Sequence, residues 1–183
     1  LKNTICLDET RRAEEEGGSA YDRMNRAIAE SAPGAGGVLF LPYLMGERAP
    51  KWNGDAKGVF YGITAKTTRQ DMLRSVMEGI VMNLAECFFI LRESTAIEEL
   101  TLIGGVARSG IWQKSIADIF GVRVNIPGYT EEANSIGAAV IAGVGSGLLK
   151  DFSAADNFLM GKEKIEFDRD SHRFYCGRRK KFN

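Results

Sequence analysis

The chain has 183 residues, of which 44% are hydrophobic and 26% are charged. This composition is typical of a globular protein, and the length fits one domain with a core of its own. The 24 basic residues balance the 24 acidic ones, so charge gives no reason to expect a nucleic acid or an anionic membrane as partner. No apolar run approaches the roughly 20 residues that a membrane span needs.

The three cysteines, at positions 6, 87 and 176, lack the spacing of a zinc or redox site. No signal peptide is recognisable, so we expect reduced thiols and a cytoplasmic protein. No cluster of histidines and cysteines predicts a metal ion held by the protein. The chain begins at Leu1 and not at methionine, which we interpret as a piece of a longer protein.

The first predicted helix covers about 20–32, where apolar residues recur at helical spacing before Pro33-Gly34 stops them. Residues 38–41 form a short apolar run that predicts a buried strand. An irregular segment over 42–57 follows, and 58–63 predicts a second strand.

The longest predicted helix begins at Thr68, with Asp71 three residues later as a variant of the capping box. Two adjacent apolar rows run along about 24 residues, or roughly 36 Å. So wide an apolar face must pack against a sheet or another helix. Gly79 within it indicates close backbone packing, and we expect the methionines to fill the core.

The second half alternates strands and helices: strands over 100–103 and 122–126, and helices over 110–120 and from Thr130 to about 143–147. Thr130 is the expected N-cap of the later helix, with Glu131 and Glu132 at the positive end of its dipole. Glu98-Glu99 is interpreted as a solvated turn, and the charged tail from Asp168 as a surface helix. The alternation predicts an α/β fold.

Gly104 and Gly105 stand between the strand over 100–103 and the helix over 110–120. Residues without Cβ atoms let a ligand approach the backbone, and the N–H groups that open a helix favour an anion. Phosphate or nucleotide contact is therefore one interpretation, and a tight structural turn is the other. Ser109 caps the following helix or faces the ligand.

Other signatures are excluded. Residues 105–110 have the glycine spacing of a P-loop, but Ile111-Trp112 stand where Lys-Ser/Thr is required. Residues 143–147 are not GxGxxG and end a helix instead of opening one. His172, the sole histidine, lies in a polar tail, which disfavours a Ser-His-Asp triad.

Residues 46–55 form a long irregular segment with Trp52 between charged groups. Long loops inside compact domains are often functional. A structural role, with Trp52 packed and the Glu47–Arg48 neighbourhood buried, and a role at a substrate site are equally compatible with this pattern.

Four blocks, spread over about 38–149, resemble the C-terminal half of the FGGY carbohydrate kinases in sequence order. They are Phe40-Leu41-Pro42-Tyr43-Leu44 with Gly46-Glu47-Arg48-Ala49-Pro50 and Trp52; residues 57–64 with 74–79; Gly104-Gly105 with Ala107-Arg108-Ser109 and Trp112-Gln113; and Glu132-Ala133 with Gly137-Ala138-Ala139. Their combination is far more specific than any single block.

The resemblance implies a ribonuclease-H-like, actin-like ATPase domain with a mixed sheet flanked by helices, lacking its first strands. All of 1–183 would be the C-terminal, nucleotide-side domain of a kinase whose N-terminal sugar-binding domain is its partner. The implied activity is phosphorylation of a sugar hydroxyl, D-xylulose above all, with ATP and Mg²⁺ that is carried on the phosphates. Gluconate is the alternative sugar, and a homodimer is left open.

The family's nucleotide loop maps onto Gly104 and Gly105, with Ser109 facing the nucleotide. Val106 departs from the pattern, because many members carry a third glycine there. Glu47, Arg48 and Trp52 are expected to line the site or the interface between domains. The catalytic aspartate lies upstream of the matched region in the family, so we assign no catalytic residue here. A non-catalytic nucleotide-binding scaffold is the alternative of another class.

Overall fold

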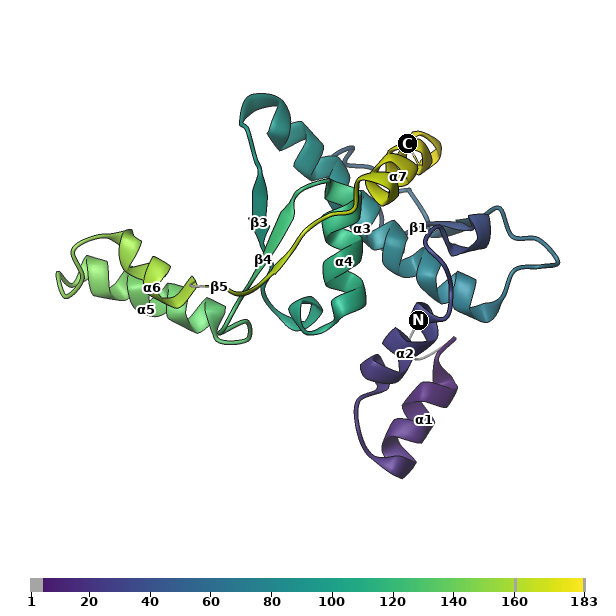
Figure 1. The fold of residues 1–183 in the computed structure, drawn as a ribbon, viewed down its shortest axis with the longest axis horizontal. Coiled ribbons are helices and arrows are strands. Elements are labelled where there is room, and N and C mark those ends of the chain that lie inside the picture. The colour runs from purple at the N-terminus through teal and green to yellow at the C-terminus, as the bar shows by residue number, and fades with distance from the viewer. Residues whose placement is uncertain (1–4, 160, 183) are drawn as a thin grey trace. The chain divides into compact units, whose positions relative to one another are not determined.

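The computed structural model describes residues 5–159 and 161–182. They divide into two compact units, the first comprising residues up to 95 together with 170–182, and the second comprising 96–169. Each unit is described by itself, and Figure 1 gives the labels of the elements. Within the described ranges, no helix is long and apolar enough to cross a membrane.

The first unit contains a β-hairpin and helices. Strand β1 (Leu39–Leu41) pairs antiparallel with β2 (Val59–Tyr61), and Phe40 lies opposite Phe60. The helices are α1 (Leu7–Glu16), α2 (Ala20–Ala29), α3 (Arg69–Ser94) and α7 (Arg169–Phe182), with the 3-10 turn η1 (Ala35–Gly37) before β1. The core lies where α3 meets β1, with buried apolar side chains at Val38, Leu39, Phe40, Leu73, Met77, Val81 and Met82.

Helix α3 confirms the prediction for the longest helix. The Thr68 hydroxyl accepts from the Asp71 backbone N–H while the Asp71 carboxylate accepts from the Thr68 N–H, so the capping box is complete. Gly79 lies against β1: a Cβ built on it would lie 2.1 Å from the carbonyl oxygen of Phe40. Only glycine permits this approach, as the sequence predicted.

The second unit contains a three-stranded mixed sheet in the order β3-β4-β5. Strand β3 (Glu99–Thr101) is parallel to β4 (Arg123–Pro127), which is antiparallel to β5 (Gly161–Ile165). The helices are α4 (Gly110–Phe120), α5 (Ala133–Gly145) and α6 (Asp156–Leu159), with 3-10 turns η2 (Gly105–Arg108) and η3 (Phe152–Ala155). Helix α4 buries Ile116, Ala117, Ile119 and Phe120, and β4 buries Val124 and Ile126.

Several boundaries correct the sequence predictions. Helix α5 has Glu132 as its N-cap residue, without a side-chain cap bond, so the prediction of Thr130 as N-cap was wrong. The Thr130 carbonyl instead accepts from the N–H of Gly104. Strand β3 begins at Glu99, inside the stretch interpreted as a turn. Helix α1 and strand β5 were not predicted, because both are rich in charged residues and present no apolar period.

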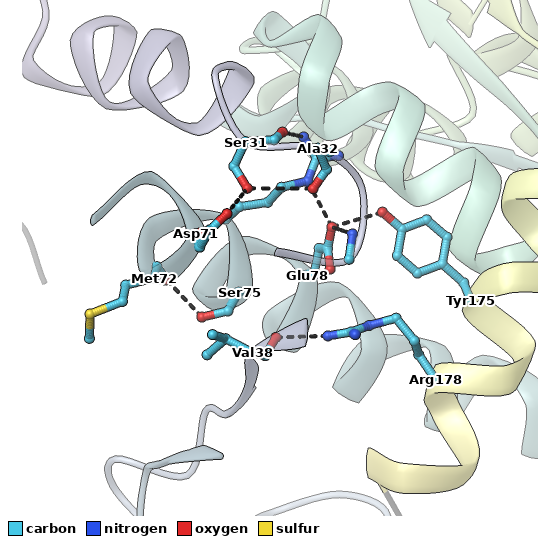
Figure 2. A network of polar contacts seen from close by, with 11 residues as sticks. Ser31, Ala32, Val38, Asp71, Met72, Ser75, Glu78, Tyr175 and Arg178 are labelled. Carbon is cyan, nitrogen blue, oxygen red and sulfur yellow. Dashed lines mark hydrogen bonds and ion pairs between the residues drawn. The ribbon is translucent and has the colours of Figure 1, made fainter. Parts of the chain in front are cut away.

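The C-terminal helix α7 is not simply a surface helix, because Tyr175 and Phe182 are buried. Figure 2 shows how it is held within the first unit. Oε1 of Glu78 accepts hydrogen bonds from the N–H of Gly34 (2.9 Å), from Nε of Arg74 (2.8 Å) and from the hydroxyl of Tyr175 (2.8 Å). Arg178 donates to the carbonyl of Val38 at 2.7 Å, so α7 is bonded to both α3 and the start of β1.

Candidate functional site

The turn after β3 has a backbone that glycine alone adopts readily. Gly104 lies at φ 78° and ψ −166°, a region that side chains with a Cβ rarely enter. Gly105 is exposed, and a Cβ built at either glycine would meet nothing within 4 Å. A Cβ built on Gly110, the first residue of α4, likewise meets nothing within 4 Å. The turn therefore presents bare backbone next to the start of a helix.

Backbone bonds fix this open turn. The N–H of Gly104 donates to the carbonyl of Thr130 at 2.9 Å, and the carbonyl of Gly104 accepts from Ala107 at 3.0 Å. The amide of Gln113, which is buried, donates to the carbonyl of Ala107 at 2.7 Å. Sequence reasoning missed the structural part of Gln113, although a glutamine on the inner face of a helix beside a glycine turn is a recognisable signal.

Ser109 occupies the N-cap position of α4 with an extended backbone, but its side chain makes no capping hydrogen bond. Its carbonyl accepts the first bond of the helix, from the N–H of Gln113 at 3.0 Å. The Ser109 side chain therefore does not cap α4, which was one of the two roles predicted for it. An α-helix offers no internal acceptor to the N–H groups of its first turn, so the start of α4 is a favourable place for an anion.

Charged side chains around the turn are paired. Arg108 contacts Glu131 at 2.7 Å on the surface. Asp118, which is buried on α4, accepts from Lys114 at 2.6 Å and from the N–H of Asp168 at 2.7 Å. Asp118 therefore holds the segment after β5 through this hydrogen bond from Asp168 and has a structural role. Among the residues that the structure describes, no three His, Cys, Asp or Glu side chains gather as a metal site.

The segment over 46–55 lies in the first unit. The three candidate residues predicted in it differ in how exposed they are. Glu47 is buried and only 4% exposed, whereas Arg48 is exposed and Trp52 is 79% exposed at a φ of 53°. Packing of Trp52 into a core was therefore the wrong interpretation. Burial raises the pKa of the neighbouring Tyr43 phenol, and the charges of Glu47 and Glu86 raise it further.

His172 also lies in the first unit, on α7. Its Nε2 is 3.5 Å from Sγ of Cys176, one turn later on the same helix. Cys176 is exposed and Cys6 is buried.

Comparison with known proteins places these features in a family. Residues 1–146 match the C-terminal domain of the FGGY family of carbohydrate kinases. The chain belongs to this family. It is 32% identical over 161 residues to a gluconokinase of Bacillus licheniformis, covering 87% of this chain and 31% of the relative. It is 35% identical over 158 residues to a xylulose kinase of Staphylococcus epidermidis, covering 85% of this chain and 32% of the relative.

Solved structures of FGGY kinases share the fold. A ligand-bound xylulose kinase of Lactobacillus acidophilus superposes with a TM-score of 0.83 at 25% identity, over 99% of this chain and 35% of that chain. A gluconate kinase of the same species gives a TM-score of 0.79 over 90% of this chain and 33% of that one. This FGGY domain therefore has the actin-like ATPase fold that its sequence predicted. It spans about a third of the length of these relatives.

Proposed function

We propose that the full-length protein transfers a phosphoryl group from ATP to a sugar hydroxyl, and that this chain supplies the nucleotide-side half of its cleft. Family membership supports the reaction class. The observation that carries the assignment of the site is the open backbone at Gly104 and Gly105, directly before α4.

In this proposal the glycines admit the nucleotide because they place no Cβ between ligand and backbone. Gly104 and Gly105 approach the α-phosphate and adenosine, and the first turn of α4 directs its N–H groups and the positive end of its dipole toward the phosphates. The hydroxyl of Ser109 serves as a further polar contact. Because Arg108 and Lys114 are already paired, backbone groups carry most of this recognition.

The magnesium ion of the reaction is held on the nucleotide phosphates in this proposal, where it neutralises charge during transfer. No catalytic residue is assigned to this chain. The base that takes the hydroxyl proton and most sugar contacts belong to an N-terminal domain that shares the cleft. Closure of two such domains excludes water and completes a phosphoryl-transfer site, so we infer that this chain alone binds nucleotide weakly and does not turn over.

D-xylulose is the proposed sugar, because the xylulose kinases compared above are more similar to this chain than the gluconate kinases in sequence, at 35% against 32% identity, and in structure, at a TM-score of 0.83 against 0.79. Gluconate is the second candidate, since relatives named gluconokinase match over 161 residues. A non-catalytic scaffold of the same fold would bind nucleotide without turnover, and this separates it from both kinases.

A coupled assay of ADP release tests the proposal with the full-length protein. D-xylulose, L-ribulose, gluconate and glycerol are compared at equal concentration with ATP and Mg²⁺. We expect D-xylulose to give the highest kcat/KM. A higher kcat/KM with gluconate would show that gluconate, and not D-xylulose, is the sugar, while the proposed phosphoryl transfer would stand. No turnover above background with any of the four compounds would contradict the proposed kinase activity.

A further inference from the structure

A buried carboxylate in the first unit has no hydrogen-bond partner within the part of the chain that the structure describes. Glu47 is 4% exposed, and neither of its carboxylate oxygens accepts a hydrogen bond from any described residue. Its backbone is satisfied, since the N–H of Glu47 donates to the carbonyl of Asn53 at 2.8 Å. A buried charge without a partner is costly, and burial in native proteins is normally compensated by donors. Glu47 is therefore suited to accept hydrogen bonds from a bound group.

Glu47 lies in a groove that is large enough for such a group. The groove has a volume of about 510 Å³ and is formed by the loop after β1 and one face of α3. Its lining includes Leu44, Met45, Glu47, Arg48, Asn83 and Leu84. Asn83 contributes a third unsatisfied acceptor atom, because its buried Oδ1 also has no partner among the described residues.

The chemistry of the lining favours a planar cation. Two carboxylate oxygens and one amide oxygen are acceptors, so the ligand must supply several donors at once. A guanidinium has five N–H donors in a rigid fork that matches a carboxylate, and it sheds water more readily than an ammonium group. Apolar side chains at Leu44, Met45 and Leu84 suit the methylene stem of an arginine.

We propose that this groove receives an arginine side chain from a polypeptide segment outside this chain, with Glu47 as its bidentate partner. Exposed apolar side chains support a polypeptide as the source: Leu44 and Met45 are 66% and 85% exposed, and exposed apolar patches mark protein interaction sites, in which methionine is enriched. The chain also spans about a third of its relatives, which leaves ample polypeptide to supply the segment. The inference concerns the first unit and does not depend on the nucleotide site.

Binding of a guanidinium group in the groove can be tested by titrating this chain with methylguanidinium chloride and monitoring the backbone amide NMR shifts. We expect saturable shifts confined to residues 43–49 and 83–87. Glu47→Gln should weaken this binding at least tenfold. Asp55→Asn removes an exposed carboxylate from the same loop and should leave it unchanged. Saturable shifts with ribitol and none with methylguanidinium would overturn the proposal in favour of a polyol site. Equal methylguanidinium binding by the Glu47→Gln variant would also overturn it, because Glu47 would then not be the partner.

The polypeptide source can be tested by comparing two lengths of protein. Glu47→Gln removes a charge that is unsatisfied in this chain, so its Tm should stay constant or rise. In the full-length protein the same substitution breaks a buried ion pair, and Tm should fall by several degrees. A Tm that moves equally in both proteins would overturn the proposal. ADP affinity of the full-length variant reports separately on the nucleotide site.

Discussion

The hydroxyl of Tyr175 on α7 donates a 2.8 Å hydrogen bond to Oε1 of Glu78 on α3, across 97 positions of sequence (Figure 2). Burial raises the pKa of Tyr175 well above its ordinary value, and the adjacent Glu78 carboxylate raises it further. Tyr175 therefore remains a protonated donor at physiological pH. Because Glu78 also holds Arg74 and Gly34, this one carboxylate joins the C-terminal helix to the loop that precedes β1.

Tyr175→Phe should destabilise the chain by about 1–3 kcal/mol, because it removes a donor from a buried carboxylate. Urea unfolding at pH 7 measures the difference. Tyr61→Phe is the matched control, since Tyr61 is 67% exposed on β2, and its midpoint should match that of the wild type. Equal midpoints for Tyr175→Phe and wild type would show that the bond to Glu78 does not stabilise the fold.

The capping box of α3 should make stability depend on acid pH. The Ser31 hydroxyl, followed by the backbone and hydroxyl of Thr68, holds the pKa of Asp71 below its ordinary value. A depressed folded-state pKa contributes stability that is complete above the unfolded value and is lost as pH falls through the folded one.

Asp71→Asn should therefore lower the free energy of unfolding by about 1 kcal/mol at pH 7, as the loss of a capping residue does. The loss should become smaller as pH falls below the ordinary carboxyl pKa of about 3.9. Urea unfolding from pH 7 to pH 3 measures the gap between variant and wild type. Asp55→Asn, which changes an exposed carboxylate, should show no such trend. A gap that stays constant with pH would exclude the charge of Asp71 as its cause.

Gly79→Ala should destabilise the chain by about 1–3 kcal/mol or more, since its Cβ would overlap the backbone of β1 and force α3 outward. Gly177→Ala is the matched control on α7, where a Cβ meets nothing within 4 Å. It should stabilise by about 0.5–1 kcal/mol through helix propensity. Thermal unfolding of both variants measures these effects, and opposite signs are the expected outcome.

Most of the regular structure could be predicted because it depends on local patterns. Helix α3 follows from two apolar rows and a capping residue, and the buried β1 follows from an apolar run. Helix α1 and β5 were missed because their charged sequences show no apolar period; Glu9 of α1 pairs with Arg69 at 2.6 Å, and β5 pairs with β4. Such pairs join residues far apart in the sequence, and no local period reports them.

The candidate site could be predicted in position but not in detail. A glycine pair after a strand indicates an open turn, and Gly104 and Gly105 form one. Ser109 has the residue type and the extended backbone of a cap, yet its side chain makes no capping hydrogen bond. The isolation of Glu47 could not be read from sequence, because an unsatisfied carboxylate is defined by what surrounds it in space.

The most direct test of the account is ADP binding to the full-length protein and its Gly105→Val variant, measured by isothermal titration calorimetry. A Cβ at Gly105 meets open space, so the variant should unfold at the wild-type urea concentration, as should the control Gly177→Val. We predict that Gly105→Val weakens ADP binding at least tenfold, or about 1.4 kcal/mol, and that the control binds ADP normally. Unchanged ADP affinity in a folded Gly105→Val variant would contradict the assignment of this turn to the nucleotide.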